Sequence, residues 1–239
     1  MAMVQTAWPI VRFGVIGDAW RLYRRHAGVW SLTSLLALLC AAVGTGIAAA
    51  ALGIASHGPL GSLVGFPGPG GKLLFVIVIS AIVGFFLGGM TRMAINQVRG
   101  RAPHLEDLFT VTDVWFDLVL GSALLGIFLT IGLYLLLIPA LIVGGLFLFV
   151  LPLIVDCRLP ATGALIQSFD ATRSQWLLAT VVHLAILFIA WVGFLLFGIG
   201  IFITAPLYPL SLAVLYRDLF LSPRSPAWAK QHHPYDEYE

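Results

Sequence analysis

The chain has 239 residues, of which 60% are hydrophobic and only 10% are charged, and its net charge is +2. Soluble globular domains carry about 25% charged residues, so this composition excludes a soluble domain and indicates an integral membrane protein. The apolar stretches are continuous, whereas a β-barrel would alternate apolar and polar residues, so the expected fold class is all-α integral membrane.

The first expected element is an amphipathic helix over residues 13–30. Its apolar positions recur at helical spacing and lie on one side: Ile16, Trp20, Tyr23, Ala27 and Trp30. Aromatic residues suit the headgroup layer and arginines suit anionic lipid. We therefore expect a surface that contacts lipid or a partner through four residues: Trp20, Arg21, Arg24 and Arg25. An equally weighted alternative makes this segment the first turns of the span that follows.

Two apolar spans follow at about 27–52 and 73–90, joined by a loop rich in glycine and proline. The second span carries Gly84 and Gly88, a GxxxG arrangement that lets a neighbouring helix approach closely. We expect these glycines to serve packing within the chain rather than dimerisation. The polar end of this span has four residues: Arg92, Asn96, Arg99 and Arg101.

The longest apolar run, Val119–Val155, has 37 residues. As one helix it would be about 55 Å long, nearly twice a hydrocarbon core of about 30 Å, so it must fold back on itself. We expect the bend near Ile138–Pro139, because proline removes a backbone donor and disfavours helix at the preceding residue.

The last apolar stretch, Ser174–Tyr216, contains no Asp, Glu, Lys or Arg. Its bend is expected near Gly198 and Gly200, where helix is disfavoured. Two prolines are expected to distort the span after this bend: Pro206 and Pro209.

Three segments share one spacing pattern, with residues at i, +4, +7 and +11 on one helix side, and each leads into an apolar region long enough for two spans. The second and third copies comprise Leu105, Phe109, Thr112 and Phe116, then Leu165, Phe169, Thr172 and Trp176. We therefore expect six transmembrane helices as three tandem units, each an amphipathic surface helix plus a transmembrane hairpin. The units cover about 13–98, 104–157 and 161–221, in a single membrane domain over 1–221. A cytoplasmic, disordered tail over 222–239 follows.

Charge placement predicts the orientation of the six spans. Twelve of the thirteen Lys and Arg residues lie on the side shared by the termini, and only Lys72 lies opposite. The positive-inside rule then places both termini in the cytoplasm of a bacterial inner membrane, which the chain crosses several times.

Candidate chemistry is sparse. The six expected spans contain no charged residue, and no nucleophile–base pair, metal cluster or dinucleotide loop is visible, so neither an enzyme nor a metal site is expected. His183 lies within an apolar region and could bind a haem or chlorin, although a hydrogen-bonded helix-interface histidine is commoner. The densest set of charges has four members that could form a headgroup or partner surface or simply anchor the helices: Asp156, Arg158, Asp170 and Arg173.

Several of these motifs carry a family resemblance. They are the Ile138–Pro139 turn, Phe149–Pro152 with the following acidic residue, and Ala164 through Thr172 to Trp176. The chain resembles the membrane domain of bacterial glycerophosphodiester phosphodiesterases and the YciC-like proteins. It departs from them at Ala140, where glycine is frequent, and at Asp156, where glutamate is frequent. It also lacks the catalytic barrel, so the resemblance implies a shared membrane fold without hydrolase activity.

The function expected from these features is that of a non-catalytic inner-membrane accessory or organising subunit. Its expected partners are membrane lipid and other membrane proteins, and not nucleic acid. One alternative is a transporter or channel for lipid or another apolar solute. A second is a pigment- or haem-binding subunit that uses His183, although no cofactor is required by the first hypothesis.

Overall fold

A computed structural model describes residues 14–51, 68–135, 137–195 and 200–221. The described residues are predominantly helical and include no strand. Five helical stretches in it are long and apolar enough to cross a membrane, which indicates a multi-pass membrane protein and confirms the expected fold class in its general form. The predictions for the glycine-rich loop, for Gly198 and for the tail over 222–239 fall outside the described residues.

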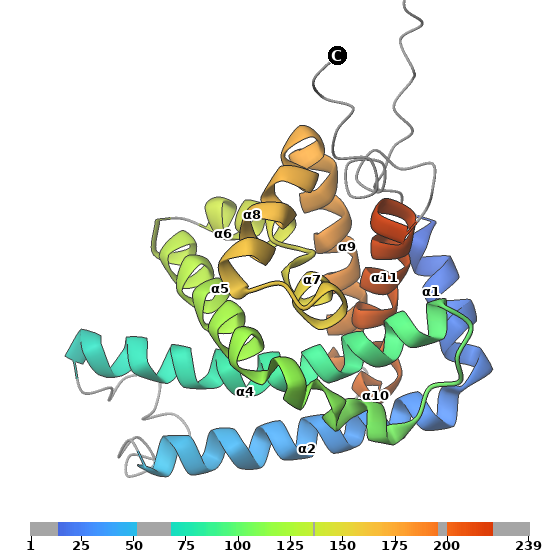
Figure 1. The fold of residues 1–239 in the computed structure, drawn as a ribbon. Coiled ribbons are helices and arrows are strands. Elements are labelled where there is room, and N and C mark those ends of the chain that lie inside the picture. Colours follow the sequence, from blue (N-terminus) through green and yellow to red (C-terminus); the bar gives the residue numbers. More distant parts are fainter. Residues whose placement is uncertain (1–13, 52–67, 136, 196–199, 222–239) are drawn as a thin grey trace, which may run out of the picture.

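Figure 1 shows the helices in chain order. The first half of the chain forms α1 (Val15–Arg25), α2 (Ala27–Ala51), α4 (Gly68–Val98), the 3₁₀ helix η2 (Leu105–Val114) and α5 (Trp115–Leu135). The second half forms α6 (Leu137–Leu146), α7 (Val150–Cys157), α8 (Ala161–Thr172), the 3₁₀ turn η3 (Arg173–Gln175), α9 (Trp176–Leu195), α10 (Ile201–Thr204), α11 (Leu207–Tyr216) and the π-helical turn η4 (Arg217–Leu221).

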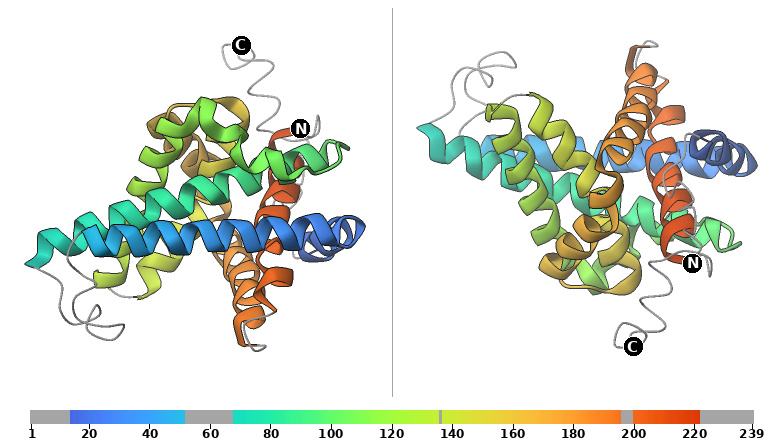
Figure 2. Two further views of the ribbon diagram at one scale, coloured as in Figure 1. Left: turned by 90° about the horizontal axis from the view of Figure 1, so that it is seen from below. Right: turned by 90° about the horizontal axis from the view of Figure 1, so that it is seen from above.

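The apolar helices form pairs that fan out from one end of the molecule. Helix α2 packs against α4, α5 against α6, and α9 against α10. In the right view of Figure 2, the far ends of these pairs point left, to the upper left and upward, while α1, η2 and α8 lie at the opposite side. The pairs are therefore splayed rather than parallel.

Helix α11 is almost entirely buried. It packs against α1, α4 and α9, and all its residues except Tyr208 are buried. A helix that is apolar all round is expected to be enclosed on every side, which is what α11 shows. The chain is interrupted just before it, at Ala205–Pro206, where the prolines predicted a distortion.

The expected single helix over 13–30 is two helices. Helix α1 ends at Arg25 and α2 begins at Ala27, with the backbone of His26 leaving helical geometry between them. One side of α1 is buried by Val15, Ala19 and Tyr23, whereas Trp20 of the predicted apolar face remains exposed. The predicted apolar face of α1 therefore divides into two parts, because Tyr23 packs against the protein and Trp20 points outward.

A buried amide joins α1, α2 and α4. The Gln97 side chain accepts from the Trp30 indole Nε1 at 2.7 Å and donates to the Leu22 carbonyl at 2.8 Å. Both partners lie far from Gln97 in the sequence. The amide therefore fixes the first two helices against the end of α4.

The second amphipathic segment differs from the expectation because η2 is a 3₁₀ helix. Its buried residues are Leu108, Val111 and Val114, which recur every third residue as three residues per turn require. The predicted pattern assumed an α-helix, and three of its four members, Phe109, Thr112 and Phe116, are exposed.

The long apolar run reverses between α5 and α6, slightly before the expected Ile138–Pro139 bend, and Pro139 lies in the first turn of α6. A proline is tolerated there because its missing N–H would have no helical partner.

A second interruption, between α6 and α7, was not expected. Here Phe149 N donates to Ser168 Oγ, Ser168 Oγ donates to the Leu146 carbonyl, and Thr172 Oγ1 donates to the same carbonyl. Side chains of α8 thus satisfy the backbone groups that the break releases.

Helices α4 and α5 meet along small residues. A Cβ at Gly84 would overlap the Ser122 side chain, and one at Gly88 would lie 2.5 Å from Leu118 Cδ2. A Cβ at Gly126 would in turn overlap Ser80. The two glycines of the GxxxG arrangement therefore lie against a helix of the same chain.

Candidate functional site

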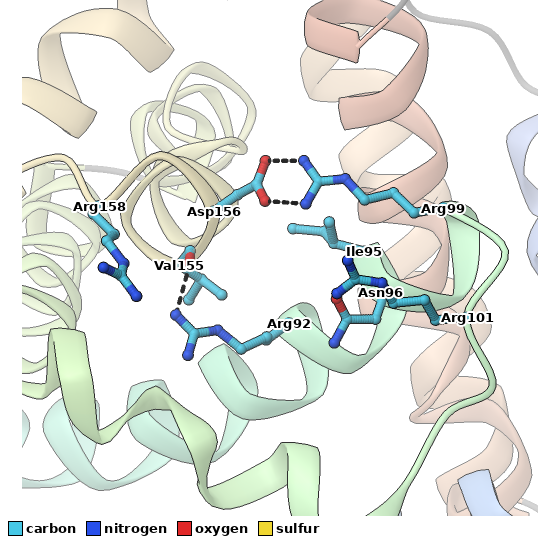
Figure 3. A pocket seen from close by; sticks show the side chains of 8 residues that line it. All are labelled: Arg92, Ile95, Asn96, Arg99, Arg101, Val155, Asp156 and Arg158. Atoms are coloured by element: carbon cyan, nitrogen blue, oxygen red, sulfur yellow. Dashed lines mark hydrogen bonds and ion pairs between the residues drawn. The ribbon is translucent and has the colours of Figure 1, made fainter.

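The charged side chains gather where α4, α7 and η2 meet. A pocket of about 310 Å³ lies between the last turns of α4 and the end of α7 (Figure 3). It is lined by Arg92, Ile95, Asn96, Arg99, Arg101, Val155, Asp156 and Arg158. Four of these eight residues are arginines, so the pocket is strongly cationic.

Arg92 is the most enclosed of these arginines and joins three elements. Its guanidinium donates to both carboxylate oxygens of Asp113, at 2.8 and 3.2 Å, and to the Thr110 carbonyl in η2. It also donates to the Val155 carbonyl at 2.9 Å, which links η2 and α7 to α4. Its role is to hold these elements in place.

Arg99 and Asp156 form the opposite edge of the pocket. The two side chains make a bidentate pair at 2.6 and 2.7 Å, a geometry that fixes the plane of both groups. The Tyr216 hydroxyl donates to Asp156 Oδ2 at 2.9 Å and contacts Cys157 Sγ at 3.2 Å. Asp156 is thereby held by α4 and by α11.

Arg158 and Arg101 are more loosely engaged. Arg158 Nη2 lies 3.0 Å from Asp113 Oδ2, and its side chain is 72% exposed, so most of its donors stay open. Arg101 is exposed and has no ion pair within the described part of the chain. In Figure 3 the Arg158 guanidinium points toward the pocket from the side opposite Arg101.

The two arginines that flank Asp113 also affect its ionisation. Hydrogen bonding from Arg92 is the largest influence and holds the pKa of the Asp113 carboxyl below its usual value, against a smaller opposing effect of burial. The charge of Arg158 acts in the same direction. Asp113 is therefore ionised at neutral pH and shared between two guanidinium groups.

The four charges predicted as one cluster separate into two places. Asp156 and Arg158 line the pocket, whereas Asp170 and Arg173 pair with each other at 3.4 Å on the exposed side of α8 and η3. The remaining predicted surface residues, Trp20, Arg21, Arg24 and Arg25, are all exposed on α1, where Arg21 pairs with Asp18.

His183 lies in α9 against α6 and is buried. A Cβ at Gly144 would lie 2.7 Å from His183 Nε2, so the backbone of α6 covers this nitrogen, and the Tyr208 ring packs edge-on against the imidazole. Nδ1 has no hydrogen-bond partner among the described residues. An axial metal ligand needs open space at one nitrogen. This packing does not favour haem or chlorin binding, which stays a prediction, and the described residues hold no group of three metal-ligating side chains.

The sequence predicted Arg92, Arg99 and Arg101 only as the polar end of a span and not as members of a site, and it did not predict a role for Asp113. The sequence does contain a pattern that could have identified Arg92 and Arg99. Together with Asn96 they are spaced at i, +4 and +7 and share one face of α4. No local pattern joins Asp113 or Tyr216 to that face, since they come from separate elements.

The fold and the site define a multi-pass helical membrane protein with a cationic pocket. The pocket lies at the end of the molecule where α4, α7 and η2 meet, which we call the charged end. No family model, no curated protein and no solved structure matches the chain. The resemblance to the glycerophosphodiester phosphodiesterase membrane domain and to the YciC-like proteins therefore stays a prediction.

Proposed function

We propose that the chain is a non-catalytic accessory or organising subunit of a bacterial inner membrane. In this role it contacts lipid and neighbouring membrane proteins through the surface elements at its charged end. The observation that carries the proposal is the set of aromatic side chains that begin the apolar segments and remain 40% to 61% exposed: Trp20, Phe109, Trp115, Phe116, Phe169 and Trp176. Exposed aromatic residues beside charged ones are typical of the headgroup layer.

The proposal includes the three-unit arrangement. Each of α1, η2 and α8 buries one side against the protein and leaves aromatic residues outward, which supports three equivalent surface elements. Helices α10, α11 and η4 together, Ile201–Leu221, would be the sixth span, interrupted before Pro206. The charge distribution supports cytoplasmic termini.

The transporter or channel alternative has less support. A solute path needs open space between the units, but α11 is almost entirely buried and packs against α1 and α4 of the first unit as well as α9 of the third. The pocket between α4 and α7 lies at the charged end, and four of its eight lining residues are arginines. A path for an apolar solute would require α11 to move.

Site-specific photocrosslinking in native membranes tests the proposed function. A benzophenone amino acid at Phe109 or Phe169 is expected to give adducts with both phospholipid and a discrete membrane protein. The same probe at Phe188, which is exposed within α9, is the control and is expected to give lipid adducts alone. Absence of any protein adduct from both surface positions would contradict an organising role, and a coloured purified protein would favour the pigment alternative.

A further inference from the structure

The lining of the pocket between α4 and α7 carries more positive than negative charge. Four guanidinium groups line it and only one carboxylate, Asp156, does so. Asp113 adds a second negative charge from η2, where it pairs with Arg92 and Arg158. An excess of two positive charges remains among these six groups, so the pocket attracts an anion.

The open donors in the pocket suit a phosphate group. Arg92 and Arg99 each already bind one carboxylate through both terminal nitrogens, Asp113 and Asp156 respectively. Arg158 gives one donor to Asp113, and Arg101 gives none to the described residues, so both present unused N–H groups. A guanidinium fork matches the spacing of two phosphate oxygens, and such charge-assisted bonds are about twice as strong as neutral ones.

The backbone at Arg158 supports a ligand-facing role. Its φ of 53° lies in the left-handed region, and it is the only described residue other than glycine with a positive φ. This position after a helix usually holds glycine, because a side chain makes the conformation unfavourable. An arginine here accepts that cost while its guanidinium reaches the pocket (Figure 3).

The surroundings of the pocket indicate its depth in the membrane. Arg92 binds η2 directly, through Thr110 and Asp113. The same segment exposes Phe109 and Phe116, which are typical of the headgroup layer. The pocket therefore opens at the level where lipid phosphates lie.

We propose that this pocket binds the phosphate group of an anionic phospholipid headgroup, with Arg101 and Arg158 as its direct donors and Arg92 and Arg99 as positioned supporting charges. The assignment rests on the lipid contact in the proposed function and names its ligand. Inorganic phosphate offers the same chemistry without the acyl chains, so the experiment must separate the two sources.

The test is lipid binding to the purified full chain in detergent, followed by native mass spectrometry. Phosphatidylglycerol and phosphatidylcholine are titrated separately, and inorganic phosphate is added as a competitor. We expect phosphatidylglycerol to bind preferentially and to resist displacement by equimolar inorganic phosphate. Each of Arg101→Gln and Arg158→Gly should weaken its binding by about tenfold, the effect expected for one charge-assisted hydrogen bond.

Two controls separate a binding role from a structural one. Arg217→Gln removes the same single charge from η4, outside the pocket lining, where the Arg217 side chain is 41% exposed, and should change the affinity by less than about threefold. Arg158→Gly should also leave the thermal unfolding midpoint unchanged or higher, because glycine relieves the left-handed backbone. Lower lipid affinity with undiminished stability is not expected for a merely structural arginine.

Three results would overturn the assignment. The Arg217→Gln control could weaken phosphatidylglycerol binding as much as the pocket variants, which would mean general attraction to the charged surface. Phosphatidylcholine could bind equally well, or inorganic phosphate could displace phosphatidylglycerol at equal concentration, and either would remove the anionic lipid as the ligand. The photocrosslinks from Phe109 and Phe169 do not depend on these arginines, so such a failure leaves the proposed function to be judged separately.

Discussion

Gly89 is the position where a single methyl group should separate two elements of the charged end. A Cβ at Gly89 would lie 2.8 Å from the carbonyl carbon and 3.0 Å from the Cα of Leu108, and closer still to the carbonyl oxygen. All these atoms belong to the backbone of η2, so no change of side-chain rotamer can relieve the overlap. Gly89→Ala must therefore push η2 away from α4.

The magnitude follows from a comparison with Gly46→Ala. Gly46 is an exposed helical position where a Cβ meets nothing within 4 Å. Both substitutions gain helix propensity of about 1 kcal/mol, so the difference between them isolates the overlap. Overpacking costs about 1–3 kcal/mol, and a rigid backbone contact belongs at the upper end. We expect Gly89→Ala to be about 2–3 kcal/mol less stable than Gly46→Ala.

The assay is reversible unfolding of the full chain in mixed micelles by increasing detergent denaturant, followed by circular dichroism. Phosphatidylglycerol affinity provides a second readout, because η2 carries Asp113 and the Thr110 carbonyl that hold Arg92. Gly89→Ala should lower both stability and affinity. Equal stability of Gly89→Ala and Gly46→Ala would refute the close approach of η2 to α4.

Three further predictions use the same unfolding assay. Because the pKa of Asp113 is lowered in the folded protein, its contribution to stability is complete above the unfolded pKa of about 3.9 and is lost as the pH falls through the lower folded value. The stability difference between wild type and Asp113→Asn should thus disappear under acid, and a difference that grows below about pH 4 would contradict this. Gln97→Leu leaves the Trp30 indole N–H and the Leu22 carbonyl without their partner and should lower the free energy of unfolding by about 2–4 kcal/mol. Gln175→Leu is the control and should be near neutral, because the buried amide oxygen of Gln175 has no described partner. Similar losses from both variants would contradict the bridging role of Gln97. Tyr216→Phe removes one hydrogen bond to Asp156 and should cost about 1 kcal/mol, and no loss would show that the bond is dispensable.

Hydrophobic content and proline positions predicted the general fold because both act locally. Composition requires helices in lipid, and Pro139 lies next to the reversal that the length of the run demanded. The geometry of η2 could not be predicted in the same way. Leu108, Val111 and Val114 fit a period of three while Leu105, Phe109 and Phe116 fit an α-helix, and both sets are mostly apolar. Tertiary packing decided between them.

The site was predicted only where its residues share one element. Asp156 and Arg158 are close in sequence and were expected together, and both line the pocket. Asp170 and Arg173 were grouped with them because they follow closely in the sequence. In the structure these two side chains pair with each other on the exposed side of α8 and η3, apart from the pocket. The decisive contact of Asp113 with Arg92 joins η2 to α4, and its formation depends on how those helices dock.

The two ends of the splayed helix pairs are held together by different interactions. In lipid, apolar side chains gain little by packing on one another rather than on acyl chains, so the far ends of the helix pairs have no strong reason to close. Exposed residues there, such as Val43 and Leu133, are consistent with this. Polar contacts hold the charged end instead, through Gln97 and the carboxylates of Asp113 and Asp156. A binding pocket needs a rigid frame, and the pocket lies at the one end where such contacts supply it.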